Sequence, residues 1–178
     1  LSLRRQRQMC IRDRVRGTLL MALSNKHHKI VLATGNKSEM AVGYATLYGD
    51  MCGGFAPLKD ISKTMVYKLS RYRNTLSEVI PLRVIARPPS AELAPDQVDQ
   101  DSLPPYDILD DILKRFVEEK QSVDSIISKG HTSEDVNKIT SLILKNEYKR
   151  RQSAPGPKVS SNAFGKERRY PMTSKFKP

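Results

Sequence analysis

Residues 29–33 form an apolar run that breaks at Thr34 and Gly35 into a short polar loop, after which a helical pattern begins near Ser38. This order predicts a strand, a loop and a helix, the unit from which parallel α/β sheets are built. In such sheets ligands collect at the carboxyl ends of the strands, where loop N–H groups and a helix N-terminus face anions. A purely structural turn explains the same pattern equally well.

The residue types in this loop suit a nucleotide phosphate and its magnesium ion. Thr34 offers a hydroxyl group, Gly35 lets backbone approach a ligand closely, and Glu39 places a carboxylate in the first helical turn. Magnesium in proteins is usually bound through one or two carboxylates together with substrate phosphates. The loop therefore predicts a phosphate and metal site, with the plain turn as the alternative.

The net charge of +12 at neutral pH suggests a different function, nucleic-acid binding. The charge is concentrated at the ends: residues 1–16 hold six Arg and one Asp, and residues 145–178 hold ten Lys or Arg and two Glu. Residues 17–144 carry a net charge of −1. A basic end with few aromatic residues for bases to stack on gives little support to nucleic-acid binding, so that function remains an alternative to a tail that meets nucleotide phosphates or lies solvated.

Length and composition indicate one domain with a core, at 178 residues and 38% hydrophobic. Cys10 and Cys52 are too few for a disulfide scaffold or a cysteine metal site, which indicates a reducing cytoplasm. No apolar run approaches the roughly 20 residues of a membrane span. Residues 1–14 have five Arg and no apolar periodicity, and look like a translated adaptor segment. We therefore expect the natural chain to begin further upstream, with a basic N-terminal arm as the alternative.

Beyond the first unit, apolar periodicity predicts mostly helices. The predicted helices cover residues 15–24, 40–48 (ending at Gly49), 63–72 (capped by Ser62), 106–120, 122–129, and a long stretch capped by Thr132 that runs through residue 151. Residues 82–86 suggest a short strand or extended segment, and residues 95–105 an ordered, lid-like loop. We expect residues 15–152 to form one domain and residues 153–178 an irregular basic tail of that domain.

Side chains that carry chemistry are spread over several of these segments. Thr34, Lys63 and Ser90 are candidate phosphate donors, and Glu39 is a candidate metal ligand, a mixture that suits phosphoryl or nucleotidyl transfer. A lysine in the first turn of a helix opposes the helix dipole unless an anion is nearby, so Lys63 suggests a phosphate, with a solvated lysine as the alternative. Asp50 precedes Gly53 and Gly54 in a turn-rich loop, where it could supply charge to a ligand that the backbone approaches; an ordinary connection with an exposed Asp explains the pattern equally well. A complete nucleotide site would also need a glycine-rich phosphate loop, and the sequence contains none.

From about Val15 to the C-terminus the sequence resembles the synthetase domain of glutamine-dependent NAD synthetases. The motifs that carry the resemblance are Thr34-Gly35-Asn36-Lys37-Ser38-Glu39, Gly49-Asp50, Leu58-Lys59-Asp60-Ile61-Ser62-Lys63-Thr64, Arg87-Pro88-Pro89-Ser90-Ala91-Glu92-Leu93, Gln97-x-Asp99, Leu103-Pro104-Pro105-Tyr106-Asp107 and Glu147-Tyr148-Lys149-Arg150-Arg151. They occur in the family's order.

The resemblance implies a fold, a reaction and a set of site residues. The implied fold is the helix-rich C-terminal half of an adenine nucleotide alpha-hydrolase-like three-layer α/β sandwich, with a Rossmann-like parallel sheet. The implied reaction joins deamido-NAD to ammonia through an adenylated intermediate formed from ATP, in a cytoplasmic homo-oligomer. The implied contacts are Thr34, Lys63 and Ser90 with ATP, Glu39 with magnesium, and Asp50, Tyr148 and Lys149 with deamido-NAD.

Two features of the family are absent from the printed sequence. The Ser-Gly-Gly-x-x-Ser pyrophosphate loop and the nitrilase-type glutaminase domain with its Glu-Lys-Cys triad would both lie upstream of Val15, and Cys52 is not that nucleophile. We therefore predict that these 178 residues alone neither hydrolyse glutamine nor make NAD. Another amidating enzyme of the ATP-pyrophosphatase superfamily is the closest rival, although the motifs at residues 87–93 and 103–106 argue against it.

Overall fold

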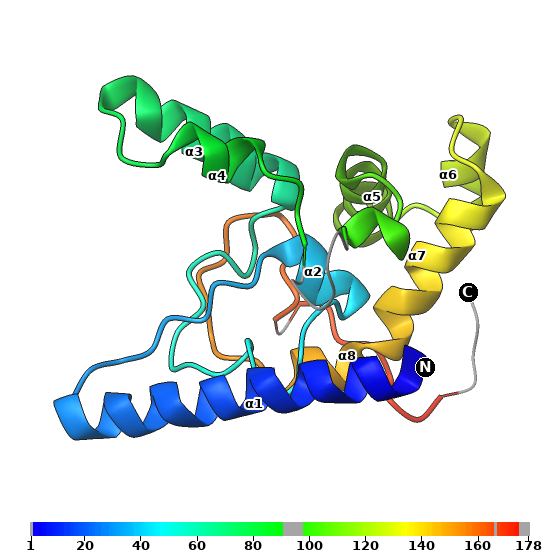
Figure 1. Cartoon of the computed structure of the whole chain (residues 1–178). Helices are drawn as coiled ribbons and strands as arrows, with labels where there is room; N and C mark the ends of the chain where they lie inside the picture. Colours follow the sequence, from blue (N-terminus) through cyan, green and yellow to red (C-terminus); the bar gives the residue numbers. More distant parts are fainter. Residues whose placement is uncertain (1, 91–97, 166, 175–178) are drawn as a thin grey trace.

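The computed structural model describes residues 2–90, 98–165 and 167–174, with side chains from residue 10 onward. The helical elements of these residues are α1 (Ser2–His27), α2 (Lys37–Val42), α3 (Lys63–Leu76), α4 (Leu82–Ala86), a 3-10 turn η1 (Asp99–Asp101), α5 (Tyr106–Leu113), a π-helical turn η2 (Lys114–Glu118), α6 (Val123–Ser128), α7 (Ser133–Lys145) and α8 (Glu147–Arg150). Figure 1 shows α2 at the centre, between α1 on one side and the α5 to α7 helices on the other.

The hydrophobic core lies where α2, α5, η2, α6 and α7 meet. The periodicity that predicted the helix at residues 106–120 is confirmed, because Leu109, Ile112 and Leu113 are buried in this core. Two residues of the irregular C-terminal segment also belong to it: the ring of Tyr170 stacks on Phe116 with 6.4 Å between ring centroids, and Phe164 is buried nearby. The C-terminal segment therefore completes the core.

The predicted parallel sheet is wrong for the residues that the structure describes, which contain no β-strand. Residues 29–33 are extended, but they pair only through one isolated parallel bridge, between Leu32 and Phe55. The Ala33 N–H donates to the Phe55 carbonyl at 2.9 Å, and the Gly54 N–H donates to Val31 at 2.9 Å. A ladder needs a second extended segment that stays in register, and only residues 53–55 run alongside.

Three predicted segments differ from the structure for local reasons. The helix predicted to reach residue 48 ends at Val42, because Gly43 adopts φ 71° and closes α2. Residues 82–86 form helix α4 instead of an extended segment, and Pro81 occupies its N-cap position, where the lack of an N–H costs the helix no hydrogen bond. The long helix predicted to run through residue 151 is interrupted at Asn146, whose side chain donates to the Val42 carbonyl at 2.9 Å.

The predicted helix starts are confirmed where a hydroxyl cap marked them. Ser62 accepts a hydrogen bond from the Met65 N–H at 3.4 Å, and Thr132 accepts one from the Asp135 N–H at 3.1 Å. Helix α1 is longer than the predicted 15–24 segment and includes most of residues 1–14. Residues 91–97, which include parts of the predicted lid-like loop and of two motifs, lie outside the described residues.

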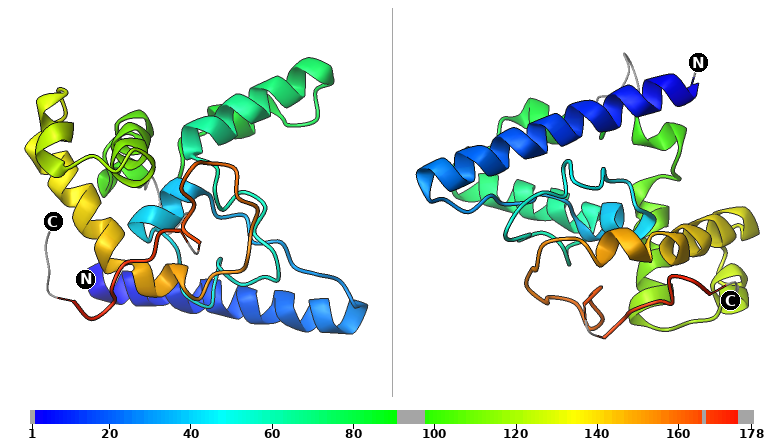
Figure 2. Two further views of the ribbon diagram at one scale, coloured as in Figure 1. Left: turned by 180° about the vertical axis from the view of Figure 1, so that it is seen from behind. Right: turned by 90° about the horizontal axis from the view of Figure 1, so that it is seen from below.

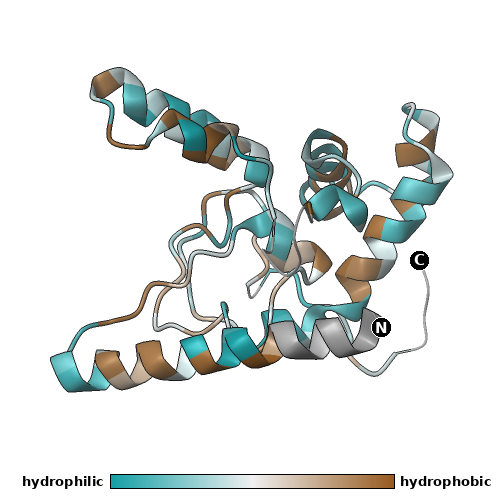
Figure 3. Ribbon diagram, viewed as in Figure 1, coloured by the Kyte–Doolittle hydropathy of each residue, from teal (hydrophilic) through white to brown (hydrophobic). Residues whose placement is uncertain are grey.

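Helices α1, α3 and α4 expose apolar side chains. The α3–α4 hairpin projects from the body in Figures 1 and 2, and neither helix buries a residue. Figure 3 shows apolar bands along α1 and this hairpin. Members of these bands are 37–68% exposed, and include Leu19, Leu23, Leu69, Tyr72 and Leu76. No helix of the described residues has the length and apolar character that crossing a membrane requires.

The close fit at Gly43 gives a stability prediction. A Cβ atom built at Gly43 would lie 2.0 Å from the Asn146 side chain, and φ of 71° disfavours any L side chain. We expect Gly43→Ala to lower the free energy of unfolding by about 2 to 4 kcal/mol, from left-handed strain and overpacking together. Gly130→Ala is the matched control, because Gly130 has φ of 101° but no atom within 4 Å of its Cβ position. If urea unfolding shows the same loss of free energy of unfolding for both variants, the contact with Asn146 does not contribute to the loss at Gly43.

A fully buried lysine ties the C-terminal segment to α2. Lys37 is 1% exposed, and its Nζ atom lies 2.9 Å from Asp60 and 2.7 Å from Glu118 of η2. It also donates to the Ser160 hydroxyl at 2.6 Å and to the Asn162 carbonyl at 3.0 Å. Four acceptors, two of them charged, therefore surround this ammonium group. Nothing in the sequence pattern marked Lys37 as buried.

Asp60 links the same segment to the loop before α3. Its carboxylate accepts hydrogen bonds from the backbone N–H groups of Val159 and Ser160 at 2.7 and 2.6 Å. Burial alone would raise the pKa of Asp60, but the hydrogen bonds from Ser160, Lys37 and Val159 outweigh it and lower that pKa. The predicted irregular tail is thus irregular but held to the body.

The lowered pKa of Asp60 predicts sensitivity to acid. A carboxylate with a depressed pKa in the folded state adds stability above its unfolded pKa, about 4, and loses that stability as pH falls through the folded value. We therefore expect the free energy of unfolding, measured in urea, to fall below about pH 4. The Asp60→Asn variant should lose less of this free energy over the same pH range. The exposed Asp107→Asn variant is the control and should follow the wild-type slope. If the free energy of unfolding of Asp60→Asn falls with pH as steeply as that of the wild type, the loss of stability in acid does not come from Asp60.

Candidate functional site

Glu39 sits in a capping box at the start of α2. The Asn36 side chain accepts from the Glu39 N–H at 3.0 Å, and the Glu39 carboxylate accepts from the Asn36 N–H at 3.2 Å. This reciprocal arrangement satisfies two backbone donors at the helix start. It also fixes the direction in which the Glu39 carboxylate points, towards the first turn of α3.

Lys63 meets Glu39 there. Its Nζ atom lies 2.9 Å from Glu39 Oε1, and both side chains are about 20% exposed. Burial alone would lower the pKa of Lys63, but the Glu39 carboxylate reverses this and raises it. The ammonium group also lies 5.5 Å from the centroid of the Tyr106 ring, within the range of a cation–π contact. The anion that the structure places beside Lys63 is the Glu39 carboxylate, whereas the predicted phosphate stays a prediction.

The backbone around Lys63 is fixed by two buried side chains that sequence reasoning missed. The Lys63 N–H donates to the Ser38 hydroxyl at 2.9 Å, and the Thr64 N–H donates to Asp110 at 2.8 Å. Ser38 and Asp110 are also hydrogen-bonded to each other. The only available signal was the place of Ser38 in the motif at residues 34–39, and of Asp110 three residues after the motif at residues 103–107. Helices α2, α3 and α5 are therefore joined at the point where Glu39 and Lys63 meet.

Asp50 and Glu39 line one small cavity of about 20 Å³. Its other lining residues are Ala33, Gly35, Met40, Ala45, Met51, Ala56, Lys59, Ser153 and Ala154. Asp50 accepts from the Thr46 N–H at 2.7 Å, and crowding by protein atoms raises its pKa although part of the residue is exposed. Thr34 is exposed between the lining residues Ala33 and Gly35. The structure thus brings the loop at residues 33–35, Glu39 and Asp50 to one place.

Lys149 holds the loop between α2 and Asp50. Its Nζ atom donates to the carbonyls of Gly43 and Ala45 at 2.7 and 2.8 Å. Burial lowers the pKa of Lys149, and the nearby Asp50 charge partly offsets this. Tyr148 precedes it on α8 and is 44% exposed. The Lys149 side chain therefore lies next to the cavity, whereas Tyr148 faces solvent.

Ser90 is tied to the same region through its neighbour. The Asp99 N–H donates to the Pro89 carbonyl at 2.9 Å, and the Asp99 carboxylate accepts from the Tyr106 hydroxyl at 2.7 Å. Ser90 is thus linked to Lys63 by way of Pro89, Asp99 and Tyr106.

The residues fit a magnesium ion that arrives with a nucleotide better than a resident metal. Among the described residues no group of three or more His, Cys, Asp or Glu is arranged to hold a metal. Both oxygens of Glu39 already accept hydrogen bonds, one from the Lys63 ammonium group and one from the Asn36 N–H. Magnesium keeps several waters and is commonly held by one or two carboxylates with substrate phosphates. Glu39 would hold it in that way.

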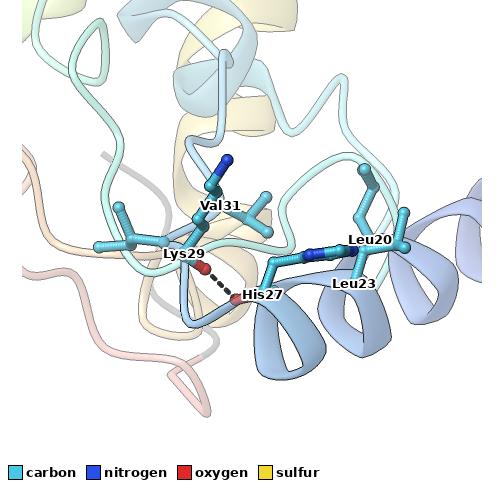
Figure 4. Close-up of a pocket in the computed structure, with 7 residues that line it drawn as sticks. Leu20, Leu23, His27, Lys29 and Val31 are labelled. Carbon is cyan, nitrogen blue, oxygen red and sulfur yellow. Dashed lines mark hydrogen bonds between the residues drawn. The ribbon is translucent and has the colours of Figure 1, made fainter.

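A larger depression lies away from these residues. It measures about 290 Å³ and lies between the end of α1 and the extended segment after it, as Figure 4 shows. Leu20, Leu23, Ile30 and Val31 give it an apolar lining. None of the candidate site residues lines it, so it is not part of the candidate site.

Comparisons with known proteins identify the family of this chain. A family model described as NAD synthase matches residues 4–153. The glutamine-dependent NAD(+) synthetase of Acinetobacter baylyi is 64% identical over 170 residues, which cover 94% of this chain and 31% of that protein. That of Xanthomonas campestris is 59% identical over 168 residues, covering 93% of this chain and 30% of that protein.

Solved structures give the same relationship. A crystal structure of a glutamine-dependent NAD(+) synthetase from Cytophaga hutchinsonii superposes with a TM-score of 0.75 at 25% identity, covering 93% of this chain and 28% of that one. The chain spans about 30% of the length of the curated relatives that it matches. Because the family model covers most of its length, this chain belongs to the NAD synthase family.

Proposed function

We propose that this chain forms part of the ammonia-ligase site of a glutamine-dependent NAD synthetase, which converts deamido-NAD to NAD at the expense of ATP. In this reaction the nicotinate carboxylate attacks the α-phosphorus of ATP and pyrophosphate leaves. Ammonia then attacks the acyl carbon, loses a proton, and displaces AMP. In the proposed whole protein, a glutaminase domain supplies the ammonia.

The observation that carries this proposal is the meeting of Glu39 and Lys63 beside the cavity that Asp50 lines. A lysine held at a helix N-terminus can neutralise the pyrophosphate group as it departs, which makes it a better leaving group. A single carboxylate beside it can hold the magnesium ion that accompanies the nucleotide. The set therefore supplies charge neutralisation and positioning, which such transfers need most.

The remaining candidate residues have matching roles in the proposal. We assign Thr34 and Ser90 to ATP, with Lys63 and Ser90 on its phosphates, and Glu39 to magnesium. Asp50 would recognise the nicotinate side of deamido-NAD, and Tyr148 and Lys149 would lie beside that substrate. In the structure two hydrogen bonds of Lys149 go to backbone carbonyls, and among the described residues its third ammonium proton has no hydrogen-bond acceptor.

The proposed site needs a second wall. The printed residues hold no Ser-Gly-Gly-x-x-Ser loop, and the chain spans about 30% of its curated relatives. The opposing phosphate loop would therefore come from a segment outside these residues. Residues 1–14 stay a proposed adaptor segment, although α1 continues through them and Asp13 accepts from the Thr46 hydroxyl at 2.9 Å.

A chimeric enzyme tests the proposal. In the Acinetobacter baylyi synthetase, this chain replaces the aligned segment, which is 64% identical. We expect the purified chimera to form NAD from deamido-NAD, ammonia and MgATP, and to reject other carboxylic acids offered in place of deamido-NAD. Amidation of a different acid in preference to deamido-NAD would favour the rival amidating ligase and overturn the proposal.

A further inference from the structure

Asp99 is a buried carboxylate to which the proposed function gives no role. It is 3% exposed and begins the η1 turn. Its backbone N–H donates to the carbonyl of Pro89, the residue before Ser90, at 2.9 Å. Its Oδ2 atom accepts from the Tyr106 hydroxyl at 2.7 Å. Asp99 therefore contacts both the segment 87–90, here called the Ser90 loop, and the first turn of α5.

Tyr106, in turn, lies against Lys63. The Tyr106 side chain is almost fully buried, and the Lys63 ammonium group lies 5.5 Å from its ring centroid. Burial and the hydrogen bond to Asp99 both raise the pKa of Tyr106, so its hydroxyl stays protonated and keeps donating. Because the hydroxyl is fixed at one end, the face of the ring presented to Lys63 is fixed as well.

The other carboxylate oxygen of Asp99 lies near a second tyrosine. Asp99 Oδ1 and the Tyr44 hydroxyl are both buried, and neither has a hydrogen bond of normal geometry among the described residues. Burial and the Asp99 carboxylate together raise the pKa of Tyr44, so these two groups interact. Asp99 therefore interacts with two tyrosine side chains, and its contact with Tyr106 is the closer one.

We propose that Asp99 is a positioning residue that sets Lys63 and the Ser90 loop relative to each other. It holds Lys63 through the Tyr106 ring and the Ser90 loop through the Pro89 carbonyl. The inference rests on the proposed function, in which Lys63 and Ser90 hold phosphates of one ATP molecule. Misplacing a reacting group by about 1 Å can cost a hundredfold in rate, so such an indirect contact is enough to matter.

The first test uses the full 178-residue chain and needs no ligand. Lysines are reductively methylated with formaldehyde and a borohydride, and the rate at each lysine is followed by mass spectrometry. We expect Asp99→Asn and Tyr106→Phe each to speed modification of Lys63 about fivefold, the factor of one lost hydrogen bond. The exposed Lys68 on the same helix is the internal reference and should not change.

Matched variants separate this role from a general loss of structure. Asp107→Asn removes a carboxylate from the exposed neighbour of Tyr106, and Tyr72→Phe removes a hydroxyl from an exposed ring of α3. Neither should alter the Lys63 rate. Tyr106→Phe keeps the buried ring, so it should remain folded even if Asp99→Asn does not. An unchanged Lys63 rate in folded Tyr106→Phe overturns the proposal.

The second test uses the chimeric enzyme. We expect Asp99→Asn and Tyr106→Phe to raise the KM for ATP about five- to tenfold, with the KM for deamido-NAD unchanged. An active chimera with an unchanged KM for ATP in both variants overturns the positioning role. A folded but inactive parent chimera counts against the proposed function instead, and the methylation rates then decide the inference about Asp99 by themselves.

Discussion

Replacing Lys37 by methionine is expected to lower the free energy of unfolding by about 3 to 5 kcal/mol, the cost of breaking a buried ion pair by removing one partner. The change leaves the Asp60 and Glu118 carboxylates near each other without their shared cation, and Lys37 is among the most deeply buried side chains of the protein. Methionine has a similar length, so the lost charge dominates over lost packing. Urea unfolding at neutral pH measures the effect.

Two controls accompany this experiment. Lys68→Met removes an exposed lysine from α3 and should change stability by less than about 0.5 kcal/mol. The double variant Lys37→Met with Asp60→Asn removes one of the stranded charges and should recover part of the loss. If Lys37→Met proves as stable as Lys68→Met, the four-acceptor contact does not hold the C-terminal segment to α2 in solution.

Lys63→Ala in the chimeric enzyme is expected to lower kcat about 100- to 1000-fold, as removal of one preorganised charge-stabilising group commonly does. In the structure Lys63 is held at its N–H by Ser38 and at its ammonium group by Glu39. A group fixed in this way costs little reorganisation when the pyrophosphate charge develops. Initial rates of NAD formation at saturating ammonia measure the effect.

Lys68→Ala is the matched control, since Lys68 is an exposed lysine one turn further along the same helix. It should keep the parent rate within about twofold. Circular dichroism of both variants checks that α3 remains folded. A Lys63→Ala chimera with the parent's kcat would remove Lys63 from the proposed chemistry and leave its contact with Glu39 as a structural ion pair.

Local signals in the sequence predicted the helices well. Ser62 and Thr132 mark helix starts that the structure confirms, because a hydroxyl cap acts within a few residues of its own position. Gly43 and Asn146 were missed as helix ends. Gly43 ends α2 and Asn146 ends α7, and the two residues meet across a sequence separation of about 100 residues, which no local pattern reveals.

The predicted sheet failed for a related reason. Residues 29–33 have the composition of a strand, but a strand also needs neighbours, and among the described residues only the segment ending at Phe55 comes alongside. The exposed side chains of Ile30 and Leu32, 65% and 53% accessible, fit a segment whose second edge is unpaired. Family membership supports the adenine nucleotide alpha-hydrolase-like class, while the described part remains helical.

The candidate site was predicted in part. Glu39 and Lys63 came from their places in the first turns of two helices, and the structure pairs them. Residues that act through others were not found, because Ser38, Asp99 and Asp110 act by contacts between distant segments. The basic C-terminal segment also misled: its charge suggested a solvated tail, whereas Phe164 and Tyr170 anchor it in the core.

The central claim is that these residues carry one wall of a deamido-NAD amidation site and need the rest of the protein to complete it. The direct measurement is ammonia- and ATP-dependent NAD formation from deamido-NAD, with the purified chain and the chimeric enzyme assayed in parallel at equal concentration. The account predicts no NAD from the chain alone and sustained formation by the chimera. NAD formation by the chain alone, or none by a folded chimera, would contradict it.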